Sequence, residues 1–456
     1  MPAIECSYRH HGEHMSCFSN RSFSTTSWRQ RVADEAHKSN IPREPESNLT
    51  TFEVLLSQVV VRAEPSTTAN ALGMRRKGDT IVAEAVVNGW AQLCDGGWML
   101  IDGSSMGVGM LLREVSVPPP ASLRATELLC FTDTHITLRS GLVMPLIGLG
   151  TGGVPGLEGE ECVRLVRHGI TKCGVRLIDS AADYHNEEAV GQAIRSCGVP
   201  RSELFVCTKF GPLSQGYEAA RASVQRSLQR MHLEYLDCVF IHWPGAWIQD
   251  QRDWSPHDWL GGRGVALARD KRAGSYRALE DLKAEGKIRT IGISNYTPTH
   301  LMELLQGCRV HPDILQSEHH PFFSNQAVRK LCEVHGIAFM AYGPLSGGHA
   351  ERKAGQKGVH NEVVREIALE AGRSAAQVVL RWATQRGVAV LPKSHRTAGI
   401  EENAALDFRL SDSQMRRLDS LETGNPVYWD PRCVDQLDHF NIFLDKDKLR
   451  KALGGT

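Results

Sequence analysis

The sequence lacks both a net formal charge and any pair of cysteines at Cys-x-x-Cys spacing. Lysine plus arginine and aspartate plus glutamate both number 52 in the 456 residues. This balance argues against a general binder of nucleic acid or of an anionic membrane, because both need an excess of cations. The 12 cysteines are scattered along the chain. Reduced thiols in a cytosol-like compartment explain them better than a secreted disulfide framework does.

Long apolar runs are also missing, and none approaches the roughly 18 residues of a membrane span. We therefore expect a cytoplasmic protein of two or three domains. Residues 1–48 show no apolar period and predict a disordered tail, although the Arg- and Ser-rich stretch 20–29 also suits a mitochondrial or plastid transit peptide, against which Glu5 and Glu13 count. No metal site is expected, because this tail's metal-capable residues match no familiar zinc spacing: His10, His11, His14 and Cys17.

Residues 52–115 have the pattern of a small all-β barrel. Short alternating apolar runs are separated by turn signals such as Lys77-Gly78-Asp79 and Asn88-Gly89. The segment resembles the bacterial-type SH3 fold, which implies a module that binds or tethers a protein or peptide partner. The alternative is a structural cap with Trp90 and Trp98 in its core. Residues 116–130, with Val117-Pro118-Pro119-Pro120, predict a stiff linker.

Residues 131–456 change to apolar, β-branched runs that alternate with helical patterns. Such repeated units predict a parallel sheet covered by helices, and eight of them fit a (β/α)8 barrel. The eight predicted strands are 146–149, 175–178, 204–207, 236–241, 288–293, 314–316, 337–340 and 388–391. A hairpin over 136–144, turning at Ser140-Gly141, is expected to plug the barrel from below.

Polar residues follow these strands, where the reactive groups of such barrels collect. At these residues the chain resembles the aldo-keto reductase superfamily, from about residue 136 to about 445. The motifs that carry the resemblance occur in order and include Gly148-Leu149-Gly150-Thr151, Asp179-Ser180-Ala181-Ala182-Asp183-Tyr184, Thr208-Lys209, Ile241-His242-Trp243-Pro244, Gly292-Ile293-Ser294-Asn295, Gln316-Ser317-Glu318-His319-His320-Pro321, Ala341-Tyr342-Gly343-Pro344-Leu345 and Leu391-Pro392-Lys393-Ser394.

Four of these residues form a catalytic set in this interpretation. A free tyrosine has a pKa of about 10, and a nearby ammonium such as Lys209 is expected to lower the pKa of Tyr184 so that it donates a proton to the substrate oxygen. Asp179 would pair with Lys209, and His242 would hydrogen-bond the carbonyl oxygen. Taken singly, each residue also has a purely structural explanation, as an ion pair, a core histidine or a packing ring.

The resemblance implies a nicotinamide cofactor, NADPH with NADH as the alternative, that delivers hydride to a small carbonyl substrate. Trp243 would line the substrate pocket. The cofactor-binding residues that it implies are Thr151, Ser294, Asn295, Gln316, Tyr342, Gly343, Pro344, Leu345, Lys393, Ser394, Arg396, Glu402 and Asn403.

The sequence departs from the family pattern at two places. The family usually has Arg six residues after the lysine of Lys-Ser, where this chain has Gly399; Arg396 could supply that charge to the 2′-phosphate of NADP. The family often has Trp after the first Gly-Thr, where this chain has Gly152, which suggests a wider substrate site. A long insert at 247–270 would also shape specificity.

Two functions remain open from the sequence. The first is a monomeric enzyme that reduces aldehydes or ketones to alcohols. The second is a cofactor-binding regulatory or scaffold subunit that uses the SH3-like module for tethering.

Overall fold

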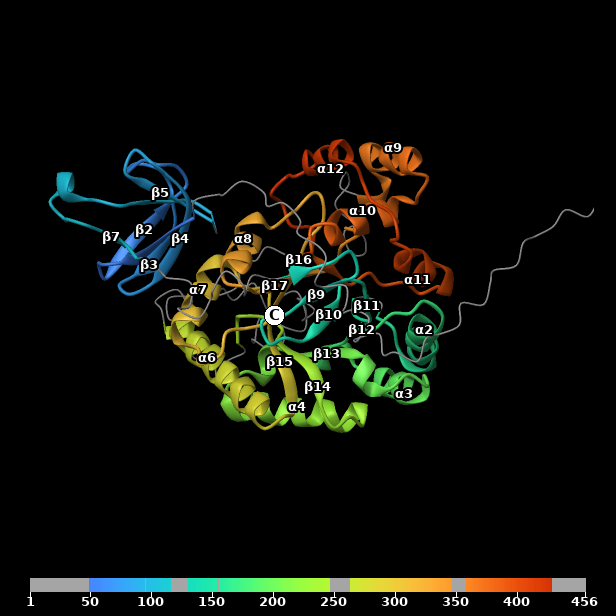
Figure 1. Ribbon diagram of the computed structural model, residues 1–456. Coiled ribbons are helices and arrows are strands. Elements are labelled where there is room, and N and C mark those ends of the chain that lie inside the picture. The colour runs from blue at the N-terminus through green and yellow to red at the C-terminus, as the bar shows by residue number, and fades with distance from the viewer. Residues whose placement is uncertain are drawn as a thin grey trace, which may run out of the picture.

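Eight parallel strands form a closed ring in the second half of the chain. The structure is a computed structural model that describes residues 49–94, 96–115, 130–153, 156–246, 263–346 and 358–428 (Figure 1). The ring follows chain order: β11 (Gly148–Gly150), β12 (Leu177–Asp179), β13 (Phe205–Phe210), β14 (Leu236–Ile241), β15 (Ile288–Ser294), β16 (Ile314–Glu318), β17 (Ala338–Tyr342) and β18 (Ala389–Val390). A parallel bridge between Ile147 and Val390 closes it. The predicted (β/α)8 barrel is therefore confirmed.

Helices follow the strands and surround the ring (Figure 1). They are α2 (Gly159–Lys172), α3 (Glu187–Ser196), α4 (Tyr217–Met231), α6 (Arg263–Ala284), α7 (Pro298–Gly307), α8 (Gln326–Val334), α9 (Glu362–Ala371), α10 (Ala375–Thr384), α11 (Thr397–Ala404) and α12 (Asp412–Asp419). The predicted C-terminal bound of the insert, residue 270, is wrong, because α6 begins at Arg263. Residues 247–262 lie outside the described residues.

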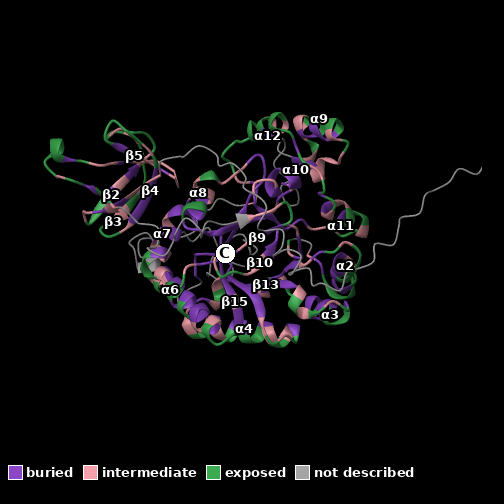
Figure 2. Ribbon diagram, in the orientation of Figure 1, coloured by how far each residue is buried: buried purple, intermediate pink, exposed green. Residues whose placement is uncertain are grey.

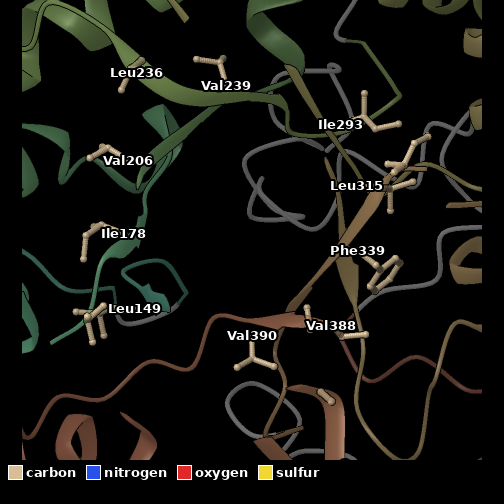
Figure 3. Packing of buried hydrophobic residues seen from close by; sticks show 14 of the residues in the cluster. Leu149, Ile178, Val206, Leu236, Val239, Ile293, Leu315, Phe339, Val388 and Val390 are labelled. Carbon is tan, nitrogen blue, oxygen red and sulfur yellow. The ribbon is translucent and has the colours of Figure 1, made fainter. Parts of the chain in front are cut away.

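Successive side chains of the barrel strands point alternately outward and inward, so the barrel has an outer and an inner apolar layer. Ile178 and Val206 pack outward against the helices, as Figure 3 shows for the ring of outer side chains. Leu177, Phe205 and Cys207 belong to a separate inner cluster. Figure 2 shows the buried strands enclosed by helices whose outer faces are exposed. Because side chains alternate with a period of two, Asp179 and Lys209 share the inward face of their strands.

A small antiparallel sheet closes the lower end of the barrel. It consists of β8 (Cys130–Phe131), β9 (His135–Thr137) and β10 (Val143–Pro145). Its turn contains Gly141, whose φ of 76° suits glycine. Ile136 and Met144 belong to the inner apolar cluster of the barrel. The hairpin expected to plug the barrel is therefore confirmed.

Residues 50–114 form a separate, purely antiparallel β unit. Its sheet has the order β3-β2-β6-β5-β4-β1-β7. The strands are β1 (Thr50–Val54), β2 (Gln58–Arg62), β3 (Ala71–Arg76), β4 (Thr80–Val87), β5 (Trp90–Leu93), β6 (Trp98–Leu100) and β7 (Leu112–Glu114). The apolar runs of the sequence place the first strand too late, at Val54-Leu55-Leu56, and none of them covers β3 or β7. The all-β character is confirmed, and the SH3-like assignment stays a prediction.

The β unit packs against α6 and α7 of the barrel. Val82 of β4 is 1% exposed and belongs to the outer apolar cluster of the barrel. Thr80 and Gln306 of α7 are hydrogen-bonded through their side chains. Arg269 of α6 donates to Asp79 at 3.0 Å. An apolar contact flanked by polar contacts thus joins the two parts.

Several expectations fall on residues that the structure does not describe. These are the tail 1–48 with its histidines and Cys17, the linker prolines and the chain after Tyr428. Within the described ranges, no helix is long and apolar enough to cross a membrane.

Candidate active site

Lys209 lies at the centre of a polar cluster at the end of the barrel where the parallel strands have their C-termini. Its Nζ donates to Asp179 Oδ2 at 2.5 Å, to the Ser180 carbonyl oxygen at 2.9 Å and to the Tyr184 hydroxyl at 3.4 Å. The lysine side chain is 0% exposed and that of Asp179 is 5% exposed. Asp179 ends β12, Lys209 lies near the end of β13, and Tyr184 ends the short 3-10 helix η2 (Ala182–Tyr184).

Burial and neighbouring charges shift the pKa values of Lys209 and Tyr184 in opposite directions. Burial alone would lower the pKa of Lys209, but Asp179 and Tyr184 raise it above its ordinary value. Burial raises the pKa of Tyr184, and the positive charge of Lys209 opposes that rise without cancelling it. The expected net lowering of the Tyr184 pKa is therefore wrong, although Lys209 acts in the expected direction. Tyr184 is a phenol at neutral pH, which is the form that donates a proton.

His242 follows β14 and faces the same cluster. Its ring meets the Tyr184 ring edge-on, with centroids 5.7 Å apart, and stacks on Trp243 at 5.5 Å. Burial lowers its pKa, and Lys209 acts in the same direction. His242 Nδ1 lies 3.4 Å from Asp183 Oδ2. The structure therefore brings the four predicted catalytic residues together, with Trp243 beside them.

A second group of predicted residues is tied to the first. Asn295 Nδ2 donates to the His242 carbonyl oxygen at 2.9 Å and to Ser294 Oγ at 3.2 Å. The Tyr342 hydroxyl donates to Asn295 Oδ1 at 2.8 Å. Gln316 Nε2 donates to Asp179 Oδ1 at 3.0 Å. The predicted nicotinamide site and the predicted catalytic set thus share hydrogen bonds.

Lys393, Ser394 and Arg396 lie between β18 and α11. Ser394 Oγ donates to the Arg396 carbonyl oxygen at 2.9 Å, and Arg396 is the N-cap residue of α11. A Cβ at Gly399 would collide with Ser394 Oγ. Two cations beside a helix N-terminus make a local environment that suits a phosphate group.

The remaining predicted cofactor residues lie around these groups. Thr151 Oγ1 donates to the Asp179 carbonyl oxygen at 2.9 Å. Gly343 lies directly against the Tyr428 ring, and Pro344 and Asn403 are buried while Leu345 and Glu402 are half-buried. No contact of the described residues assigns these last four to a ligand.

Sequence reasoning missed several residues that hold the site. Asn186 donates to the Thr151 and Leu157 carbonyl oxygens at 3.2 and 2.9 Å. Gln215 Nε2 donates to the carbonyl oxygens of Trp243 and Gly245, both at 2.7 Å. These amides bind backbone atoms of loops distant in sequence, so no motif indicates them.

Gly152 lies directly against the Tyr184 ring. A Cβ at this position would collide with ring carbons of the tyrosine. The space expected to widen the substrate site is therefore occupied on this side by Tyr184 and the Gly152 backbone. Glycine at this position permits the close approach of chain and ring.

The barrel with this polar set defines an oxidoreductase of the barrel-fold class. The chain belongs to the Aldo/keto reductase family, whose model matches residues 146–423. It is 38% identical over 297 residues to 9,11-endoperoxide prostaglandin H2 reductase of Trypanosoma cruzi, covering 65% of this chain and 94% of the relative. It is 39% identical to glyoxal reductase of Bacillus subtilis, covering 64% and 94%. An aldo-keto reductase structure from a deep-sea metagenome library superposes with a TM-score of 0.56 at 31% identity, covering 65% and 97%.

We predict that Tyr184 ionises above the ordinary tyrosine pKa of about 10. Burial raises its pKa, so the phenolate forms only as the pH rises beyond that value. Replacing Lys209→Met removes the opposing positive charge and shifts the ionisation still higher. Ultraviolet difference titration of the wild type against Tyr184→Phe measures the ionisation; a midpoint below that of free tyrosine contradicts the prediction.

We predict that Gly152→Ala lowers the free energy of unfolding by about 1–3 kcal/mol, the cost of overpacking. The added methyl collides with the Tyr184 ring, which must move away from Lys209. Gly307→Ala is the matched control, since nothing lies within 4 Å of its added methyl. Urea unfolding measures both changes, and a crystal structure of the variant reports the Tyr184–Lys209 distance. Equal stability of the two variants would show that the collision is absent.

Proposed function

We propose that the protein is an NAD(P)H-dependent oxidoreductase that reduces aldehydes or ketones to alcohols, with Tyr184 as the general acid. One observation carries the proposal: Lys209 Nζ contacts Asp179 and the Tyr184 hydroxyl together inside the barrel end. The tyrosine oxygen accepts from Lys209, so its own proton is available to a substrate. After that proton leaves, the ammonium stabilises the phenolate.

His242 is the second residue that we propose to contact the substrate oxygen. Placed beside Tyr184 and stacked on Trp243, it donates a hydrogen bond where negative charge develops during reduction. Trp243 is 6% exposed and shields this side of the His242 ring from water. Asp179 keeps Lys209 charged, so it acts through the lysine.

The residues present fit a nicotinamide cofactor. A primary carboxamide offers an acceptor oxygen and two N–H donors. Asn295 Oδ1 accepts from Tyr342, while Ser294 accepts from Asn295 through Oγ and retains its own proton. The Ser294 hydroxyl therefore offers a donor to the carboxamide oxygen, beside a fixed amide at Asn295. When bound, the reduced cofactor supplies the hydride.

NADPH is the preferred cofactor in this proposal. Lys393 and the exposed Arg396 place positive charge beside the first turn of α11, where a phosphate would bind. The names of related proteins agree: a relative in Saccharomyces cerevisiae, 32% identical, is an NADPH-dependent aldose reductase. Glyoxal reductase is likewise a carbonyl-reducing relative by its name, and a small carbonyl compound is the proposed substrate class.

A tethering role for the β unit is the second candidate. The β unit exposes large apolar side chains on β3 and β4: Leu72 at 60%, Met74 at 52%, Val86 at 49% and Val87 at 44%. Several large apolar side chains exposed on one small unit favour an interaction surface, although β3 and β4 are not neighbours in the sheet. In this second proposal the β unit has an SH3-like fold and binds a protein or peptide partner. The protein is proposed to act in the cytoplasm.

We predict that Tyr184→Phe lowers kcat for carbonyl reduction by about 10²–10⁴-fold, the usual contribution of a general acid. The ring remains against Gly152 while its hydroxyl is lost, so cofactor affinity changes little. Loss of reduced-cofactor absorbance with an aldehyde panel measures the rate, and fluorescence titration measures the affinity. Wild-type turnover by the variant, or cofactor binding without turnover by the wild type, would contradict the assignment.

We predict that Arg396→Ala weakens NADPH binding about tenfold or more and leaves NADH binding nearly unchanged. The guanidinium is expected to pair with the 2′-phosphate, and a hydrogen bond to a charged group contributes about 1.5–3 kcal/mol. Arg416→Ala, on α12, is a control that removes the same charge elsewhere. Isothermal titration with both cofactors measures the ratio; an equal loss for NADH would show that Arg396 does not read this phosphate.

A further inference from the structure

The carboxylate of Asp183 lies near Nδ1 of the His242 ring. Asp183 Oδ2 lies 3.4 Å from His242 Nδ1. The histidine is 6% exposed, and within the described ranges no atom makes a regular hydrogen bond to Nδ1. A shift of the carboxylate by a few tenths of an ångström would bring the pair to normal hydrogen-bond distance. Asp183 is therefore placed to accept a hydrogen bond from this nitrogen.

The local backbone makes room for this contact. Asp183 and Tyr184 are neighbours on η2, so one short element carries both groups toward His242. The Asp183 carboxylate lies over Gly211, where a Cβ would collide with it. The backbone of Gly211 has a φ of −87°, which any residue adopts. The lack of a side chain at Gly211 is thus a spatial requirement of the carboxylate.

The charged groups that face His242 come from three elements. Asp183 extends from η2, Asp179 from β12 and Lys209 from β13, and both carboxylates raise the pKa of the ring while burial and Lys209 lower it. His185 and Lys209 also act on Asp183 itself. Burial would raise the pKa of Asp183, but its contact with His242 and the nearby side chains of His185 and Lys209 bring it below the ordinary value. Asp183 is therefore ionised over the neutral range.

The position of the histidine proton decides what the ring can do. A neutral imidazole carries one proton, and a carboxylate beside Nδ1 favours the tautomer with the proton there. Nε2 then has a lone pair and donates a hydrogen bond only when the ring is protonated. A protonated ring stabilises negative charge on a substrate oxygen more strongly than a neutral one does.

We propose that Asp183 is a positioning residue that holds the Nδ1 proton of His242 and thereby makes the imidazolium the donor to the substrate oxygen. The inference rests on the proposed carbonyl reduction. The Asp183 side chain is 43% exposed, so solvent screens part of its charge, and the hydrogen bond to Nδ1 carries the effect. Two groups on η2, Tyr184 directly and Asp183 through His242, then control both protons near the substrate.

The sign of the pH dependence follows from these charges. Reduction that needs a protonated His242 declines as the pH rises through the pKa of the ring. Removing the Asp183 carboxylate takes away a group that raises this pKa, so the decline begins at lower pH. A shift of about one pH unit corresponds to roughly a tenfold loss of rate above the break.

The test combines Asp183→Ala with Gly211→Ala. The first variant removes the carboxylate, and the second displaces it without changing charge. Nitrogen NMR of protein labelled at the histidine ring, with His242→Asn for assignment, reports which nitrogen carries the proton. The pH profile of kcat/KM is recorded for the same proteins. Glu188→Ala, which removes an exposed acid in the first turn of α3, is the control.

We expect wild-type His242 to carry its neutral-form proton on Nδ1, and both variants to lose that preference. We also expect about a tenfold fall in kcat/KM at neutral pH, a break at lower pH, and an unchanged control. A wild-type ring protonated on Nε2 overturns the inference, and so does a slower Asp183→Ala enzyme with the wild-type profile and tautomer. The NMR result requires no turnover, so it remains decisive even where the wild type reduces no carbonyl compound and the proposed function fails.

Discussion

The buried ion pair between Lys209 and Asp179 is the interaction on which the site depends. Both side chains are almost fully withdrawn from water, and removing one partner of such a pair costs about 3–5 kcal/mol, because a charge is left buried alone. All three protons of the ammonium have acceptors: Asp179, the Ser180 carbonyl oxygen and the Tyr184 hydroxyl. Gln316 then binds the other carboxylate oxygen. A pair of this kind adds little stability over apolar packing, so its value lies in the fixed position of the groups around it.

Burial and charge act in opposite directions on the pKa of Tyr184, and the balance fits the general-acid role that we propose for the phenol. Burial raises its pKa and keeps the proton in place before a substrate arrives. The ammonium of Lys209 opposes this and is ready to stabilise the phenolate that forms when the proton departs. The proposed proton donation therefore needs no net lowering of the Tyr184 pKa. In that reaction the ammonium would contribute a difference in stability between the states before and after transfer, which is where catalysis acts.

The sequence predicted the barrel and the candidate catalytic set from different signals. Apolar runs alternating with helical patterns identified the strands, while the polar residues at the strand ends, inside motifs that resemble the aldo-keto reductases, indicated Asp179, Lys209 and their neighbours. The strand β3 was missed because Ala71–Arg76 lacks β-branched residues and is largely exposed. The net direction of the Tyr184 pKa was missed because burial depth is a property of the packed structure. The contact between Asp183 and His242 joins two motifs whose mutual distance no spacing rule gives.

The β unit is connected to the candidate active site of the barrel by a continuous run of polar contacts. Asp79 accepts from Arg269, which also binds Glu303. Glu303 accepts from Arg272, a guanidinium that is 4% exposed and that donates to the Pro244 carbonyl oxygen at 3.1 Å. Pro244 follows Trp243 and His242 directly in the chain. The buried guanidinium of Arg272 is stable there because Glu303 balances its charge. The loop that carries Trp243 is therefore held from the side of the β unit through Arg272. Gln215 holds the same loop from within the barrel.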